Sequence, residues 1–227
     1  MNLRFIRPSR RTQTSIKTLT GIALVCVLAA CSAARDAEAP TAENLAAPLD
    51  EYLAQRGDIC LAMFDWPIDL TEAEAGSGAR HAVQFPVMEQ LGLVHSTLVA
   101  VPKSAENPDG AVKRFELTDA GRKFYRPHAS AAQGAGQQKQ PANDFCVAHL
   151  KREQIVDVKV DAANAQHPLA VVSYTYQIDT APWMQEAEAQ RVFPMIARIA
   201  NGAGGKLQLR QGFTRGDKGW VAQVGPV

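Results

Sequence analysis

The sequence LAVVSYTYQI, residues 169–178, carries the strongest strand signal in the chain. β-Branched and aromatic side chains dominate it, and these side chains favour the pleated, partly buried surface of a β-sheet. Further strands are predicted on both sides of it, over residues 145–150, 155–160, 206–213 and 220–224. The strands over residues 145–150 and 155–160 are expected to form one long strand with a kink near residue 151.

A helix is predicted between the strands, over residues 181–200. Pro182 suits its first turn, Pro194 is expected to break it, and Gly202 ends it. The half of the chain over residues 144–227 therefore predicts a β-β-α-β-β order, which is an antiparallel sheet with one packed helix. Sheets of this kind occur in many modules of the cell envelope and do not imply one function.

Helices and short strands alternate in the first half of the chain. A helix over residues 44–56 presents leucines on one face, and Pro48 is expected in its first turn. A buried strand is predicted next, over residues 59–64. Thr71 and Glu74 then form a capping box, in which a Thr at the N-cap and a Glu three residues later begin a helix.

Residues 84–125 resemble the winged-helix fold. The elements that carry the resemblance are a helix over residues 81–91, strands over 94–102 and 112–117 joined by KSAENPDG, and a short helix capped by Thr118 within LTDAGR. The resemblance implies a helix packed under a two-stranded wing. Pro86 departs from the pattern, and the helix lacks the Arg, Lys and Asn side chains that read bases. The resemblance therefore implies a way of packing and not DNA binding.

The predicted fold class is α+β, with two halves. The winged-helix-like half covers residues 48–128 and the antiparallel sheet half covers residues 144–227. Between them, ASAAQGAGQQKQPAN at residues 129–143 is polar and low in complexity, which predicts a flexible linker.

The N-terminus has the pattern of a secretory signal peptide. A basic segment precedes an apolar run of about ten residues, which is too short to span a membrane. The run ends in Leu-Ala-Ala-Cys at Cys31, which resembles the lipobox of bacterial lipoproteins. The resemblance implies cleavage of residues 1–30 and acylation of Cys31, while Ser32 favours the outer membrane and residues 31–47 form a tether. A plain secretory leader with an unmodified Cys31 is the alternative.

Removal of the leader changes the charge and the cysteine count. The leader holds five of the 24 Lys and Arg residues and none of the 23 Asp and Glu residues, so the formal net charge falls from +1 to −4. An acidic protein outside the cytoplasm is not expected to bind nucleic acid. Of the four cysteines, Cys60 and Cys146 remain unmodified, and an oxidising compartment favours a disulfide between them. Two separate buried thiols are the alternative.

The sequence contains no strong catalytic or metal-binding motif. The five histidines have no partner at ligand spacing, so neither a metal nor a cofactor is predicted. Asp65 and Asp69 flank Trp66, an arrangement that could serve a glycosidase, although two solvated acids in a turn fit it better. Trp66, Trp183 and Trp220 are candidates for a carbohydrate or peptide surface, and each is equally a candidate for the core.

These observations predict a lipid-anchored envelope protein that faces the periplasm and acts as a non-catalytic binding or structural module. Its expected partners are the membrane, through the lipid anchor, and another envelope protein. Two alternatives stay open at this point. One is an inhibitor or immunity-type lipoprotein directed against a secreted hydrolase, and the other is an enzyme that acts on envelope polymers.

Overall fold

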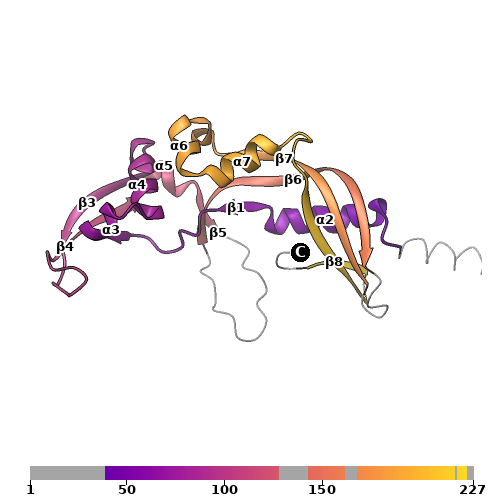
Figure 1. Cartoon of the computed structure of the whole chain (residues 1–227), viewed down its shortest axis with the longest axis horizontal. Coiled ribbons are helices and arrows are strands. Elements are labelled where there is room, and N and C mark those ends of the chain that lie inside the picture. Colours follow the sequence, from indigo (N-terminus) through magenta and orange to yellow (C-terminus); the bar gives the residue numbers. More distant parts are fainter. Residues whose placement is uncertain (1–38, 128–142, 162–167, 218, 224–227) are drawn as a thin grey trace, which may run out of the picture. The chain divides into compact units, whose positions relative to one another are not determined.

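The computed structural model describes residues 39–127, 143–161, 168–217 and 219–223. The predicted leader and Cys31 lie outside these residues, as do residues 31–38 of the predicted tether and nearly all of the predicted linker. The described chain mixes helices with a curled antiparallel sheet and a separate three-stranded sheet (Figure 1). None of the helices in the described residues is long and apolar enough to cross a membrane.

The strand at LAVVSYTYQI lies inside the curled sheet, as the sequence predicts. The strands of this sheet are β1 (Asp58–Cys60), β6 (Asn143–Asp161), β7 (Leu169–Thr180), β8 (Leu209–Gly216) and β9 (Gly219–Ala222), in that spatial order, with β5 (Tyr125–Pro127) also paired to β6. All of these pairings are antiparallel. The register of β6 against β7 shifts after Arg152 and again after Ile155. Such bulges bend a strand, and they lie close to the kink predicted near residue 151.

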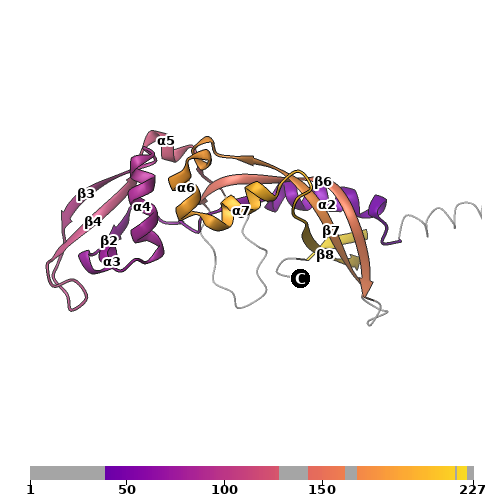
Figure 2. The ribbon, with the colours of Figure 1, turned by 45° about the horizontal axis from the view of Figure 1, so that its top comes forward.

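The helix α2 (Ala42–Arg56) runs along the curled sheet, as both ribbon views show (Figures 1 and 2). Leu45, Leu49 and Leu53 are buried in one core with side chains of β7 and β8. The helix begins earlier than predicted because Thr41 caps it, with its Oγ1 accepting a hydrogen bond from the Asn44 amide at 3.2 Å. Pro48 consequently lies inside the helix and not in its first turn. Burial of the three leucines offsets the backbone hydrogen bond that this proline cannot donate.

The helix predicted over residues 181–200 is divided into three pieces. They are the 3-10 helix η1 (Pro182–Gln185), α6 (Ala187–Val192) and α7 (Pro194–Gly202). Pro194 begins the last piece, as expected of a residue that cannot continue a helix. Trp183, Val192 and Phe193 belong to a core that they share with the first half of the chain. The long helix that packs against the curled sheet is instead α2, which comes from the first half of the chain.

The three-stranded sheet has the spatial order β2-β4-β3. Its strands are β2 (Ile68–Leu70), β3 (Val94–Ala100) and β4 (Ala111–Leu117), accompanied by α3 (Glu72–Gly76), α4 (Arg80–Gln90) and α5 (Asp119–Arg122). The capping box of Thr71 and Glu74 is confirmed at the start of α3. Phe85 and Met88 of α4 are fully buried beside Phe115 of β4, so the helix packs on one face of this sheet (Figure 2). The strand β2 was not predicted.

Two apolar cores hold the described chain together within one compact unit, Pro40–Val227. The first core contains side chains from both predicted halves, for example Phe85 and Phe115 with Phe145 and Trp183. The second core lies between α2 and the curled sheet. Since each core draws on segments that are far apart in the sequence, each half of the chain contributes to the stability of the other.

Candidate functional site

An open cleft of about 840 Å³ lies beside Trp66, and we call it the Trp66 cleft. The loop before β2, strands β3, β4 and β5, and the start of α5 all contribute to it. Its lining residues are Trp66, Pro67, His95, Glu116, Leu117, Thr118, Asp119, Arg122 and Tyr125. The volume is in the range of protein sites that bind small molecules.

Trp66 is the largest aromatic residue that lines the cleft, and other aromatic rings pack against it. Its ring packs against Phe85 and Phe145, with centroid distances of 5.8 and 6.3 Å. The indole Nε1 is buried and has no hydrogen-bond partner in the described part of the chain. Trp66 as a residue is only partly buried. Because Nε1 is buried, any part of the indole that solvent reaches is made of carbon atoms.

Two pairs of polar side chains line the cleft, each made of an acid and a hydrogen-bond donor. Nε2 of His95 lies 3.2 Å from Oε2 of Glu116, its direct partner across strands β3 and β4, and both side chains are about half exposed, at 51% and 48%. Arg122 and Asp119 form a second pair at 2.5 Å, one turn apart on α5, with side chains 60% and 96% exposed. Exposed pairs of this kind contribute little to stability. The His95, Glu116 and Asp119 side chains can therefore turn towards a ligand at small cost. Arg122 is held in place more firmly, because its Nη1 also donates to the Leu117 carbonyl at 2.6 Å.

The hydroxyl groups that line the cleft already have partners. Thr118 Oγ1 donates to the Gly92 carbonyl at 2.6 Å and accepts from the Gly121 amide at 3.1 Å, so it caps α5. The Tyr125 hydroxyl donates to the Phe64 carbonyl. Burial and the nearby charge of Asp65 raise the pKa of Tyr125, which keeps this phenol neutral. Neither hydroxyl is placed as a free nucleophile.

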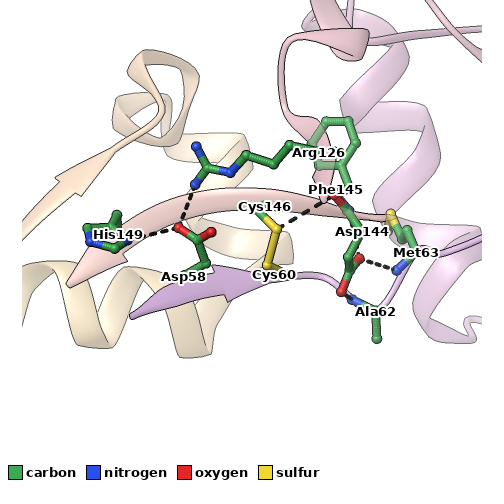
Figure 3. Close-up of a disulfide and its surroundings, with 9 residues drawn as sticks. All are labelled: Asp58, Cys60, Ala62, Met63, Arg126, Asp144, Phe145, Cys146 and His149. Carbon is green, nitrogen blue, oxygen red and sulfur yellow. Dashed lines mark hydrogen bonds and ion pairs between the residues drawn. A yellow bond between two sulfur atoms is a disulfide. The ribbon is translucent and has the colours of Figure 1, made fainter. Parts of the chain in front are cut away.

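The predicted cysteine pair lies behind the cleft. The structure joins Cys60 of β1 to Cys146 of β6 by a disulfide, and the two residues lie directly opposite one another in the sheet (Figure 3). Beside it, the buried carboxylate of Asp144 accepts hydrogen bonds from the amides of Ala62 and Met63, at 3.1 and 2.8 Å. These contacts turn the chain away from β1 and direct it towards Trp66. The strand predicted over residues 59–64 ends early at this turn.

The turn after β1 also contains backbone strain. Ala62 has a φ of 54°, in the left-handed region that side chains other than glycine rarely adopt. The bond from its amide to Asp144 holds this conformation in place. On the other side of the disulfide, Asp58 accepts from Arg126 at 2.7 Å and lies 2.9 Å from Nδ1 of His149 (Figure 3). Strands β1, β5 and β6 are therefore joined by side chains as well as by backbone pairing.

The other residues singled out in the sequence have structural surroundings. Trp183 and Trp220 are buried in the two cores. Asp69 forms a bidentate ion pair with Arg114, with both distances at 2.7 Å. The hydrogen bonds from Arg114 lower the pKa of Asp69. An acid held in this way by a neighbouring guanidinium is not poised to pair with Asp65 in glycoside hydrolysis.

The histidines that the structure describes do not form a metal site. His81 stacks on Phe85 at 4.8 Å between ring centroids, and burial lowers its pKa. His95 and His149 each face a carboxylate. His128 and His167 lie outside the described residues. Within the described ranges, no cluster of three or more His, Cys, Asp or Glu side chains could hold a metal ion.

No protein-family model, no curated protein and no solved structure matches the chain. The site must therefore be understood from its own residues. Sequence reasoning singled out Trp66 but did not associate it with Glu116, Asp119 or Arg122. These residues come from separate segments, and only the tertiary structure brings them together.

Proposed function

We propose that the protein is a lipid-anchored component of the cell envelope that acts by binding, without catalysis, through the Trp66 cleft. The observation that carries this proposal is the combination of a partly buried tryptophan with two exposed pairs of polar side chains in one hollow. Sites that recognise ligands commonly combine apolar walls with a few convergent polar groups. The disulfide and Asp144 provide a rigid support behind it.

The anchoring part of the proposal rests on the sequence. A basic segment, a short apolar run and Leu-Ala-Ala-Cys at Cys31 resemble the leader of bacterial lipoproteins. On this basis Cys31 carries the lipid, and Ser32 directs the protein to the outer membrane with its folded part in the periplasm. A disulfide between Cys60 and Cys146 agrees with such an oxidising compartment.

We also propose that residues 84–125 pack in the manner of a winged helix. The order β2-β4-β3 with α4 against one face of the sheet supports this arrangement. The loop between β3 and β4 would be the wing. Phe85 and Met88 of α4 are buried in the core, and Pro86 lies inside the helix. A helix with this composition supports packing and offers no base-reading surface.

Binding fits the cleft better than catalysis. His95 and Glu116 could exchange a proton, but an exposed pair of this kind is common across neighbouring strands. The hydroxyls of Thr118 and Tyr125 are engaged with backbone groups. Neither hydroxyl that lines the cleft is therefore a free nucleophile for covalent catalysis.

Cross-linking in living cells, followed by mass spectrometry of the captured molecules, tests the proposal. The wild-type protein is compared with a variant that carries Glu116→Gln and Arg122→Gln. We expect the wild type to capture a defined envelope component and the variant to lose most of it. Equal capture by both proteins would contradict binding through the cleft. Capture of a single lytic enzyme, lost in the variant, would identify the protein as an inhibitor.

A further inference from the structure

We propose that the Trp66 cleft binds an uncharged oligosaccharide. This inference rests on the proposed binding function and specifies the chemical class of the ligand. A sugar ring has an apolar face of C–H groups and a rim of hydroxyls, and each hydroxyl both donates and accepts hydrogen bonds. The cleft offers a matching surface for each of these two parts.

Trp66 matches the apolar face of a sugar ring. Trp66 lines the cleft and is only partly buried as a residue, while the one polar atom of its indole, Nε1, is buried. Any part of the indole that faces the cleft is consequently a flat carbon surface, which favours contact with C–H groups. Packing against Phe85 and Phe145 fixes the orientation of the ring. Little conformational entropy would therefore be lost when a ligand stacks on it.

The two polar pairs match the hydroxyl rim. Glu116 and Asp119 supply acceptors, while Arg122 and His95 supply donors. Hydrogen bonds that involve a charged group are stronger than bonds between neutral groups. Each carboxylate in the cleft has a donor beside it, so acceptors and donors are offered together. This arrangement favours a hydroxyl-rich ligand, because each of its hydroxyls both donates and accepts.

An extended peptide would fit the cleft less well. Peptides that add to a sheet need a run of unpaired backbone groups along a strand edge. Strand β4 is paired with β3 from Ala111 to Leu117 and with β2 from Lys113 to Phe115. At the end of β4 that lines the cleft, Glu116 and Leu117 extend past the pairing with β2. Two residues are too few for strand addition on β4, so recognition on this side of the cleft relies on side chains.

Fluorine NMR of the full-length processed protein, labelled with 5-fluorotryptophan, tests the inference. The protein has three tryptophans, of which Trp66 lines the cleft while Trp183 and Trp220 are buried elsewhere. The protein is kept in a detergent without a sugar headgroup. The probes are the neutral trisaccharides chitotriose, maltotriose and cellotriose, with a proline-rich decapeptide for comparison. Trp66→Phe assigns the resonance of Trp66.

We expect at least one trisaccharide to shift the Trp66 resonance in a saturable way and to leave the other two resonances unchanged. Glu116→Gln and Arg122→Gln should each weaken this binding at least tenfold, and Arg122→Lys should restore part of it. Arg191→Gln is the matched control. Arg191 forms the same kind of pair with Glu188, one turn apart on α6 and outside the cleft. The resonances of Trp183 and Trp220 show whether each variant is folded.

Two results would overturn the inference. One is that no trisaccharide shifts the Trp66 resonance while the protein is folded, and the other is that the control variant loses binding as much as the cleft variants do. A shift caused by the peptide alone would also overturn it, although the proposed binding function would stand. Equal capture by the wild type and by the cleft variant in cells would contradict the binding function itself. The two failures are therefore distinguishable.

Discussion

Asp144 fixes the turn of the chain that leads from β1 towards Trp66. The residue is only 3% exposed, and its carboxylate accepts hydrogen bonds from three backbone amides, those of Ala62, Met63 and Phe145. An amide side chain at this position would place an NH₂ group against at least one of these donors. A buried donor without an acceptor is costly.

Asp144→Asn is therefore expected to lower the free energy of unfolding by about 2 kcal/mol. Urea unfolding measures the change. Asp157→Asn, on the same strand, is the matched control. The Asp157 side chain is half exposed, and its carboxylate lies 3.9 Å from the Lys159 ammonium, which makes this a weak surface pair. An equal effect of the two substitutions would mean that the hydrogen bonds of Asp144 are not important.

The pKa of Asp69 provides a second test at the scale of one residue. Hydrogen bonds from Arg114 lower this pKa below its ordinary value. A carboxyl whose pKa is lowered in the folded state stabilises that state above the pKa of the unfolded chain. This contribution is lost as the pH falls through the folded-state pKa.

Arg114→Gln should raise the pKa of Asp69 towards the ordinary value of an aspartate, as measured by carbon NMR of the carboxyl groups. Asp179 is the internal control, since its pKa is lowered by a hydrogen bond from Lys151 and not by Arg114. If the pKa of Asp69 did not move, the bidentate pair would not exist in solution.

At the scale of elements, the disulfide joins β1 to the long strand β6. Cys60 and Cys146 are separated by 86 residues in sequence. In the chain-entropy model, closing a loop of this length stabilises the fold by about 4 kcal/mol. Replacing both cysteines with alanine should lower the free energy of unfolding by a similar amount. Titration of thiols in the unfolded protein checks that the bond is present, and equal counts with and without reductant would contradict it.

Local signals were sufficient to predict most of the elements. The capping box of Thr71 and Glu74 and the cap at Thr118 depend only on neighbouring residues, and both are present. The strands β2 and β5 were missed because three residues are too few to display a periodic pattern. The partner of α2 could not be predicted, since an apolar helix face does not specify which sheet it covers.

The candidate site was the least predictable part of the protein. Trp66 was visible as an aromatic residue between two acids, but neither Asp65 nor Asp69 lines the cleft. Its neighbours in the cleft are Glu116, Asp119 and Arg122, which lie some 50 residues further along the chain. Hydrophobic periodicity contains no information about such polar contacts.

At the scale of the whole molecule, we propose that the leader determines where the folded part acts. Cys31→Ala is expected to leave an unprocessed precursor without lipid, because the resemblance to lipoproteins assigns both cleavage and acylation to this cysteine. Mass spectrometry of the N-terminus and partition into a detergent phase provide the measurement. Normal cleavage together with detergent partition of the variant would contradict lipid attachment at Cys31.

The central claim is that the protein acts by binding through the Trp66 cleft, and photo-cross-linking in intact cells tests it most directly. A photoreactive amino acid is placed at Asp119, on the rim of the cleft, or at Glu188, an exposed position on α6 outside it. The account predicts a specific cross-linked product from position 119 and none from position 188. Equal labelling from both positions, or no labelling from position 119, would contradict it.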